Sequence, residues 1–311
     1  MTHGSVVCLG EALVDMIEVP TDEGPMFLPA WGGSSLNVAV GVARLGHRVE
    51  FGGSFARDPL GQRLKDFLVA EQVGMDLSVD IDGQTTIAMT TFVNHEPRYS
   101  FYAHPASYGF LPPAIAIREQ VAHASVVHGG SLGVLEPMTC EAMEEAFQAT
   151  EGFVTFDPNV RPSMVTDWDD YRSRLGRLIR HAKLVKFSAE DIAVTYPGMT
   201  PEAIAQATLD QGAQAVIVTE AQDGATLVTH DQTTRLPIAA GFSLKDTTGG
   251  GDSTMAAMIA QIDRSGVPSD HSGWLSYLEN ALIVAAVVCS RSGGAIAMPT
   301  LEEARGAGAR L

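Results

Sequence analysis

The sequence predicts an α/β protein with a mainly parallel central sheet flanked by helices on both faces. Short β-branched runs bounded by Gly, Pro or Asp alternate along the chain with longer segments that have the apolar period of an amphipathic helix. This alternation favours a parallel sheet, because parallel strands are joined by crossovers that are usually helical. The length of 311 residues allows two average domains or one large α/β domain.

Six segments are expected to form buried strands, and five are expected to form helices between them. The strands are residues 6–10, 49–53, 125–128, 153–156, 184–187 and 215–219. The helices are residues 35–45, 60–72, 139–150, 169–181 and 201–211. A further helix is expected to follow the glycine run that ends at Asp252.

Two stretches, residues 12–31 and 84–104, interrupt this rhythm with alternating apolar and polar side chains. A period of two is typical of strands with one solvated face, so both stretches are expected to form hairpins outside the parallel core. No change of composition and no Pro- and Ser-rich linker divides the chain. We therefore expect residues 1–311 to form a single α/β domain that carries a small β-sheet lid.

The composition limits the classes of partner. Hydrophobic residues make up 45% of the chain and charged residues 18%, which is typical of a soluble globular protein. The 20 Lys and Arg residues against 37 Asp and Glu residues give a net charge of −17, which disfavours binding to nucleic acid or to an anionic membrane. A phosphate-bearing ligand would therefore have to be held by local geometry or by a metal ion.

Cysteine and histidine usage argues against a disulfide framework and against a catalytic transition metal. Three separated cysteines form no Cys-x-x-Cys pair, and nine histidines form no His-x-x-x-His pattern. The longest apolar run, residues 281–289, is less than half of the roughly 20 residues that a membrane span needs. Since residues 1–5 show no basic leader, we expect a cytoplasmic protein.

The strongest local feature is the run Lys-Asp-Thr-Thr-Gly-Gly-Gly-Asp at residues 245–252. Its glycines, Gly249, Gly250 and Gly251, bring backbone N–H groups to a helix N-terminus, where partial positive charge favours a phosphate. Asp252 follows, and its carboxylate could accept a proton from a hydroxyl that attacks this phosphate. A flexible loop with an ordinary acidic N-cap explains the same residues about equally well.

Two further polar residues lie near the amino-terminal elements. Asp15 falls just past the first strand, near the edge where open α/β sheets bind ligands, although a lone Asp there is also typical of a turn. Asn37 lies in the first turn of the helix that Gly32 and Gly33 precede, and its amide could bond paired hydroxyls. In the alternative interpretation, Ser34 or Ser35 caps the helix and Asn37 points to solvent.

Two more clusters follow strands in the middle of the chain. Arg161, in the run Phe-Asp-Pro-Asn-Val-Arg-Pro at residues 156–162, could grip a phosphate or could pair with Asp157. Glu190 and Asp191 could bind Mg²⁺ through water or could simply begin a helix.

Together these segments resemble the ribokinase-like (PfkB) carbohydrate kinases in order and spacing. Residues 32–39 look like the first motif of the family, and residues 246–252 look like the second, which usually reads DTTGAGD. The runs GEALVD at residues 10–15 and FDPNVR at residues 156–161 most resemble the fructokinase branch. The resemblance covers essentially the whole chain and implies a ribokinase-like core with a lid that closes over a sugar.

The resemblance implies an ATP-dependent sugar kinase that uses Mg²⁺, with fructose as the favoured acceptor. It also implies that Asp252 is the catalytic base and that the amides of Gly249, Gly250 and Gly251 form an anion hole. Ribose, 2-keto-3-deoxygluconate or a nucleoside would be alternative acceptors within the family. A non-catalytic sugar-binding or regulatory protein is the alternative from a different class.

Further roles are implied position by position. The sugar would contact Asp15, Gly32, Gly33, Asn37, Tyr102 and Arg161. The nucleotide would contact Thr219, Asp223, Gly224 and Asn280. Mg²⁺ would be held through water by Glu190 or Asp191, because Ser188 to Asp191 stand where the family has Asn-x-x-Glu. Many members bind a monovalent cation such as K⁺, and the matching positions here are Asp246, Thr248, Arg291 and Gly293.

Some positions depart from the family pattern or leave a choice open. Ala221 replaces the glycine that is usual in the nucleotide loop, which leaves the nucleotide preference open. Phe101, Tyr102 and His104 would shape the choice of sugar. The lid could form the surface of a homodimer, or charge and covering loops could protect its strand edges.

Overall fold

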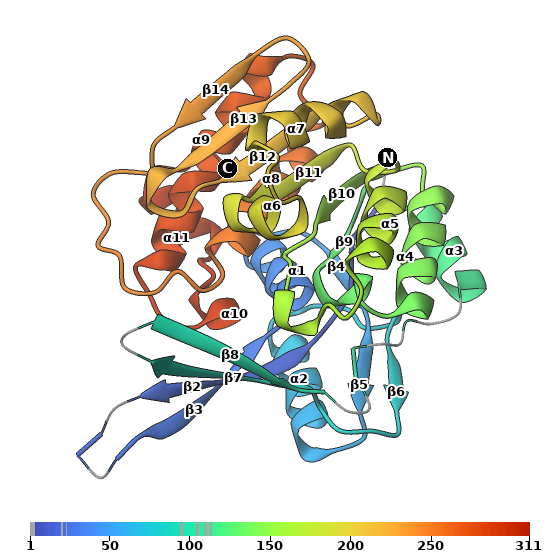
Figure 1. Cartoon of the computed structure of the whole chain (residues 1–311), viewed down its shortest axis with the longest axis vertical. Helices are drawn as coiled ribbons and strands as arrows, with labels where there is room; N and C mark the ends of the chain where they lie inside the picture. Colours follow the sequence, from blue (N-terminus) through green and yellow to red (C-terminus); the bar gives the residue numbers. More distant parts are fainter. Residues whose placement is uncertain are drawn as a thin grey trace.

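The centre of the molecule, described here from a computed structural model, is an eight-stranded sheet in the order β14-β13-β12-β11-β10-β9-β1-β4 (Figure 1). The structure describes residues 4–19, 21–22, 24–93, 96–103, 106–108, 111 and 114–311. The strands of the central sheet are β1 (Val6–Leu9), β4 (Val49–Gly52), β9 (Val126–Gly130), β10 (Phe153–Asp157), β11 (Leu184–Ser188), β12 (Ala215–Thr219), β13 (Ala225–Val228) and β14 (Thr233–Leu236). Neighbours from β4 to β12 pair in parallel, whereas β13 and β14 form an antiparallel edge.

The expected parallel sheet is therefore confirmed, and its six predicted strands agree with the structure to within two residues at each end. The five predicted helices, now α1, α2, α4, α5 and α7, agree equally well. The helices are α1 (Ser34–Arg44), α2 (Pro59–Ala70), α3 (Ala114–Ala122), α4 (Pro137–Ala149), α5 (Trp168–Ile179), α6 (Ala189–Thr195), α7 (Pro201–Asp210), α8 (Gly250–Ser265), α9 (His271–Cys289), α10 (Gly294–Ala297) and α11 (Leu301–Gly306).

Successive side chains of each central strand enter two different cores, because a strand points them alternately to its two faces. In β1, Val6 and Cys8 pack with α1, α8 and α9, whereas Val7 and Leu9 pack with α4 and α5 on the opposite face. Both faces are thus apolar, which explains why these strands read as continuous hydrophobic runs.

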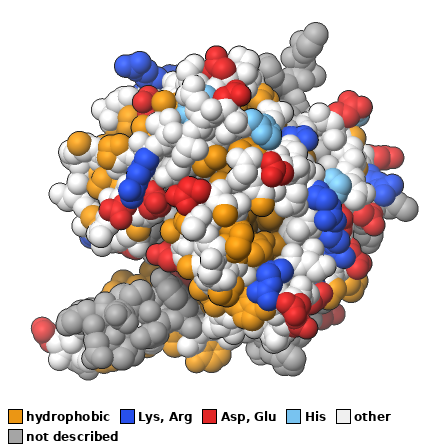
Figure 2. All heavy atoms as spheres, turned by 45° about the horizontal axis from the view of Figure 1, so that its top comes forward, with side chains coloured by type: hydrophobic (Ala, Val, Ile, Leu, Met, Phe, Trp, Pro, Cys, Tyr) orange, Lys and Arg blue, Asp and Glu red, His pale blue; other side chains and the backbone are white. Residues whose placement is uncertain are grey.

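The stretches that interrupt the rhythm form a separate four-stranded sheet, which we call the small sheet. Its strands are β2 (Leu13–Val19), β3 (Met26–Gly32), β7 (Ile87–Val93) and β8 (Glu96–Tyr102), in the order β3-β2-β7-β8. Two antiparallel hairpins are joined by parallel pairing of β2 with β7. The small sheet projects from the body of the molecule below α10 (Figure 1), and β3 packs against α10. Figure 2 shows Asp and Glu side chains at several places over the face of the main body. Nearby, β5 (Ser54–Ala56) pairs with β6 (Val79–Ile81).

Helix α9 is long and apolar enough to cross a membrane by length and composition alone. Its residues Trp274, Leu278 and Val288 are buried in the core that also contains α8. Burial in that core accounts for part of the hydrophobic composition of α9.

Helices α1 and α8 pack closely, and this contact positions the candidate site. A Cβ atom added to Gly41 of α1 would lie only 2.7 Å from Cβ of Ala256 in α8. The glycine therefore lets the two helices approach, and their first turns meet beyond the carboxyl end of β1.

Candidate active site

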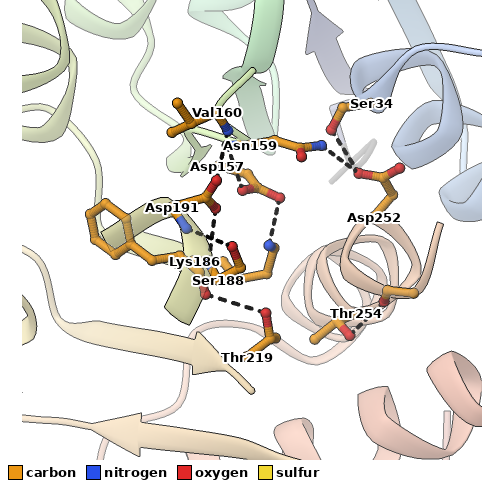
Figure 3. A network of polar contacts seen from close by, with 12 residues as sticks. Ser34, Asp157, Asn159, Val160, Lys186, Ser188, Asp191, Thr219, Asp252 and Thr254 are labelled. Atoms are coloured by element: carbon orange, nitrogen blue, oxygen red, sulfur yellow. Dashed lines mark hydrogen bonds and ion pairs between the residues drawn. The ribbon is translucent and has the colours of Figure 1, made fainter. Parts of the chain in front are cut away.

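Asp252 lies in the first turn of α8 and is only 7% exposed. Its Oδ1 accepts hydrogen bonds from Ser34 Oγ at 2.7 Å and from Asn159 Nδ2 at 3.3 Å (Figure 3). Its Oδ2 accepts a hydrogen bond from Asn37 Nδ2 at 2.8 Å. Three donors, two from α1 and one from the loop after β10, thus orient one carboxylate.

These contacts overturn the interpretation in which a serine caps α1 and Asn37 points to solvent. Gly33 occupies the N-cap position, and Ser34 donates its hydroxyl to Asp252. Ser35 donates its hydroxyl to the carbonyl oxygen of Leu9. Asn37 is only 5% exposed, and its Oδ1 has no hydrogen-bond partner among the residues that the structure describes.

The glycine run forms the predicted turn into a helix. Gly249 has a φ of 81°, in the left-handed region that glycine adopts without a steric penalty. The N–H of Gly250 donates to the carbonyl oxygen of Thr247 at 3.1 Å, so this amide belongs to the turn. The N–H groups of Gly251 and Asp252 open the helix, where an α-helix supplies no acceptor of its own.

An ion pair lies beside this helix start. Lys186 Nζ is 3.0 Å from Asp157 Oδ2, and both side chains are almost completely buried (Figure 3). Burial acts to lower the pKa of Lys186, but the carboxylates of Asp157 and Asp191 outweigh burial and raise it. The lysine was missed by the sequence analysis, although a lysine inside a buried strand is itself an unusual signal.

Arg161 does not pair with Asp157, which corrects the salt-bridge alternative. Its Nη1 donates to Asn159 Oδ1 at 2.6 Å and to the carbonyl oxygen of Asn159 at 3.1 Å. Arg161 therefore supports the asparagine that contacts Asp252.

Two carboxyl groups, that of the buried Glu11 and that of the partly buried Asp15, lie within the electrostatic influence of Arg161. Burial raises the pKa of Asp15 to about 7 and the pKa of Glu11 to about 7, and the charge of Arg161 opposes both shifts. Glu11, a second residue that the sequence analysis missed, accepts the N–H of Ser34 at its Oε1. Asp15 reaches Gly32, where an added Cβ would lie 2.0 Å from its Oδ2. The predicted sugar-side residues Asp15, Gly32, Gly33, Asn37 and Arg161 are thus brought into one region.

The residues that were expected to belong to a lid are less closely tied to this region. Tyr102 is 59% exposed on β8, whereas Phe101 packs against a small apolar cluster that includes Leu13 and Leu132. His104 lies outside the described residues.

Three of the four residues that were predicted to contact the nucleotide lie together at the end of β12 and just after it. Thr219 ends this strand, and its Oγ1 donates to the carbonyl oxygen of Phe187 at 3.3 Å. Asp223 and Gly224 follow in and after a short 3₁₀ helix, Ala221–Asp223.

Asn280 is engaged elsewhere. Its Nδ2 donates to Gln261 Oε1 and to the carbonyl oxygen of Ser276, and its Oδ1 accepts the N–H of Arg310. These contacts tie the C-terminus to α8 and α9. Both N–H donors of the Asn280 side chain are already used within the protein. Its proposed nucleotide contact remains a prediction that the structure does not favour.

The four residues matched to the monovalent cation lie around one loop contact. Asp246 Oδ1 accepts the N–H of Thr248 at 2.9 Å, and Oδ2 accepts the N–H of Gly293 at 3.2 Å. The side chain of Arg291 turns away to Glu303, with Nη2 2.7 Å from Oε1. Each carboxylate oxygen of Asp246 keeps a second lone pair, so this carboxylate can still coordinate a cation.

The two candidate Mg²⁺ residues differ in how they are held. Asp191 is buried, with Oδ1 accepting the N–H of Val160 and Oδ2 accepting the N–H of Ser188, whereas Glu190 is exposed. Within the described residues, no group of three or more His, Cys, Asp or Glu side chains could hold a metal ion. Any Mg²⁺ would therefore be bound largely through water and phosphate oxygens, which suits this ion.

Comparisons with known proteins show which proteins this chain resembles over most of its length. Residues 3–301 match the model of the pfkB family of carbohydrate kinases. The fructokinase of Klebsiella pneumoniae is 29% identical over 96% of this chain and 97% of its own length. The fructokinase of Rhizobium leguminosarum bv. trifolii is 29% identical over 83% of this chain and 79% of its own length.

Solved structures confirm the expected ribokinase-like fold. The crystal structure of a fructokinase with bound ATP from Xylella fastidiosa matches with a TM-score of 0.89 at 27% identity, covering 97% of each chain. Aminoimidazole riboside kinase from Salmonella enterica, complexed with aminoimidazole riboside and an ATP analogue, has a TM-score of 0.84 at 23% identity. That match covers 98% of this chain and 99% of the other.

Proposed function

The chain belongs to the pfkB family of carbohydrate kinases, and from this premise we propose that it transfers the γ-phosphoryl group of ATP to a hydroxyl of fructose. The phosphotransfer to an alcohol group follows from the family. Fructose as the acceptor is supported by the relatives that carry the name fructokinase. The observation that carries the proposed mechanism is the buried carboxylate of Asp252 at the start of α8, held by Ser34, Asn37 and Asn159.

Asp252 acts as the general base in this proposal. The attacking sugar hydroxyl gives its proton to the carboxylate, its oxygen forms the new bond to the γ-phosphorus, and the bond to the bridging oxygen of ADP breaks. Since three neighbours donate to the carboxylate, its direction is fixed before the sugar binds. Such preorganisation places the base where the hydroxyl must lie.

Backbone N–H groups at the start of α8 stabilise the negative charge on the phosphoryl oxygens in this proposal. The amides of Gly251 and Asp252 are open there, and the helix dipole adds partial positive charge. Gly249 and Gly250 shape the turn that presents these amides. Of the three amides predicted to form the anion hole, those of Gly249, Gly250 and Gly251, the proposal keeps that of Gly251 and adds that of Asp252.

The cations have residues that fit them. The exposed carboxylate of Glu190 is available to hold Mg²⁺ through water, and Asp246 with the backbone around Thr248 and Gly293 suits a monovalent cation such as K⁺. Bound Mg²⁺ would neutralise charge on the phosphate oxygens.

The sugar would lie between Asp252 and the small sheet, with Asp15 and Arg161 available to its hydroxyls. The Oδ1 of Asn37, which accepts no hydrogen bond from any described residue, would also be available. In this proposal the small sheet acts as a lid that carries Tyr102 and excludes water during transfer. The nucleotide would lie near Thr219, Asp223 and Gly224, at the carboxyl edge of the central sheet.

A phosphotransfer assay with ATP, Mg²⁺ and K⁺ tests the proposal over fructose, ribose, 2-keto-3-deoxygluconate and a nucleoside. We expect fructose to give the highest kcat/KM, with ADP and fructose phosphate formed in equal amounts. A higher kcat/KM for another acceptor would overturn the choice of fructose. Fructose binding without ADP formation from any acceptor would instead favour a sugar-binding protein.

The variant Asp252→Asn tests the base. We expect its kcat to fall by at least about 10²-fold, because general base catalysis typically contributes 10²–10⁴-fold. An unchanged kcat in a folded Asp252→Asn protein would rule out the base.

A further inference from the structure

Lys186 lies in the middle of the buried strand β11, on the face that α8 covers. Leu184, two residues earlier, packs in the core beneath α8, and strand alternation sends Lys186 to the same face. Its side chain is only 4% exposed. Burying a charged ammonium costs free energy unless an opposite charge and hydrogen bonds compensate it. Lys186 is therefore expected to have an anionic partner.

Asp157 accepts only some of the hydrogen bonds that the ammonium of Lys186 can donate. The two side chains form an ion pair, with 3.0 Å between Nζ of Lys186 and Oδ2 of Asp157. An ammonium carries three donors, and one carboxylate oxygen can take at most one or two of them. Lys186 therefore keeps at least one donor for a further acceptor.

The ammonium also lies beside the open amides of α8. A Cβ atom added to Gly251 would be 3.1 Å from Lys186 Nζ, and Figure 3 shows the lysine reaching between Asp157 and the start of α8. The positive end of a helix dipole and a lysine ammonium repel each other unless an anion lies between them. Two such groups side by side favour an anion that contacts both of them.

We propose that Lys186 is a catalytic residue, whose ammonium binds a non-bridging oxygen of the γ-phosphoryl group together with the amides of Gly251 and Asp252. The inference rests on the proposed function. During transfer the lysine keeps its proton, while the sugar oxygen binds phosphorus, the bond to ADP breaks and the hydroxyl proton moves to Asp252. Asp157 is then a positioning residue that holds the ammonium on this side of the sheet.

The competing explanation is a purely structural ion pair between Lys186 and Asp157. The single variant Lys186→Met leaves a buried carboxylate without its cation and is expected to lower Tm. The double variant Lys186→Met/Asp157→Asn removes both charges with similar side-chain volumes and is expected to recover Tm. Lys183→Met is the matched control, since this lysine begins the same segment but donates to Gly212 at the surface.

Turnover separates the two explanations. We expect both Lys186 variants to lose about 10²–10³-fold in kcat, the usual effect of removing one preorganised donor to a reacting oxyanion, with little change in KM for the sugar. The control Lys183→Met should keep its kcat. Recovery of both Tm and kcat in the double variant would overturn the proposal and leave a structural ion pair.

Nucleotide binding gives a readout that needs no turnover. We expect Lys186→Met to weaken binding of the non-hydrolysable analogue AMP-PNP about tenfold, as for one charge-assisted hydrogen bond, and to change ADP binding less than twofold. Equal effects on both nucleotides, or none, would overturn a γ-phosphoryl contact. If the wild-type protein phosphorylates no acceptor, the proposed function fails, yet this comparison still decides the role of Lys186.

A wild-type complex with ADP, Mg²⁺, aluminium fluoride and fructose needs no variant that could misfold. We expect Lys186 Nζ at about 3 Å from a fluoride. A separation of more than about 4 Å would show that the ammonium does not touch the transferred group.

Discussion

Asn37 Nδ2 lies 2.8 Å from Asp252 Oδ2, so a residue in the first turn of α1 orients a carboxylate 215 positions further along the chain. The contact exists because α1 and α8 pack against each other and their first turns meet. Gly41 permits that packing, since the nearest atom to its missing Cβ is Cβ of Ala256. The geometry of the base therefore depends on helix packing about one turn away from it.

Gly41→Ala should disturb both stability and turnover. Its new methyl group would lie 2.7 Å from Ala256 Cβ, and overpacking of this kind typically costs 1–3 kcal/mol. Because the strain moves α1 relative to α8, we expect a lower Tm and a lower kcat, measured by calorimetry and by the ADP release assay. Gly176→Ala in α5 is the control, since nothing lies within 4 Å of its Cβ position. Equal behaviour of the two variants would contradict this role for Gly41.

Asp15 should make the free protein less stable as pH rises. Burial raises its pKa to about 7 from an ordinary value of 3.8, so between these pH values the folded state binds more protons than the unfolded state. Stability then falls as pH rises from about 4 to about 7 and is flat above that range. We expect Asp15→Asn to reduce the difference in Tm between pH 5 and pH 7.5. An unchanged difference would show that Asp15 is not the group that titrates.

The same carboxyl group should control sugar binding. An ionised Asp15 accepts sugar hydroxyls without a competing proton, so we expect kcat/KM for the sugar to rise through a pKa of about 7. Glu11, whose pKa is also raised to about 7, titrates over the same pH range. The Asp15→Asn profile should therefore lose part of the rise and keep the part that Glu11 contributes.

Ala221→Gly should stabilise the protein, although most alanine-to-glycine changes do the opposite. Ala221 has a φ of 49°, a left-handed conformation that costs a non-glycine residue about 1–2 kcal/mol. Glycine removes this strain and adds about 0.5–1 kcal/mol of backbone entropy cost, so we expect a net gain of up to about 1 kcal/mol in the free energy of unfolding. The control is Ala207→Gly, in the exposed interior of α7, which should lose about 1 kcal/mol. Chemical denaturation of both variants measures the contrast.

Local patterns predicted the elements of this fold, and long-range pairing limited the prediction of the site. The glycine run before Asp252 indicates a helix start, because its signal lies within eight consecutive residues. The donors Ser34 and Asn159 could not be assigned to Asp252, since they lie 218 and 93 positions away and only tertiary packing brings them together. The antiparallel edge strands were not predicted. In β14, Thr-Thr-Arg-Leu, no residue is buried, so this strand lacks the continuous apolar run by which the central strands were identified.

The pairing of Lys186 with Asp157 can be inferred from the sequence. The run Leu-Val-Lys-Phe at residues 184–187 reads correctly as a buried strand, but a lysine inside such a strand must have a compensating partner. That partner, Asp157, was already noted at the end of the preceding strand. Neighbouring parallel strands would have placed the two together, and Arg161 would then not have been needed as the partner of Asp157.

Glu190 and Asp191 can be distinguished as Mg²⁺ residues by separating stability from metal dependence. Both oxygens of Asp191 accept backbone N–H groups, from Val160 and from Ser188 in the capping box of α6, so Asp191→Asn should lower Tm. The exposed Glu190 has no such role, and we expect Glu190→Gln to keep Tm and to raise the Mg²⁺ concentration needed for half-maximal turnover. Titrating Mg²⁺ at saturating ATP measures this concentration for each variant. An unchanged Mg²⁺ requirement in Glu190→Gln, with a raised one in a stably folded Asp191→Asn, would assign the metal to Asp191 instead.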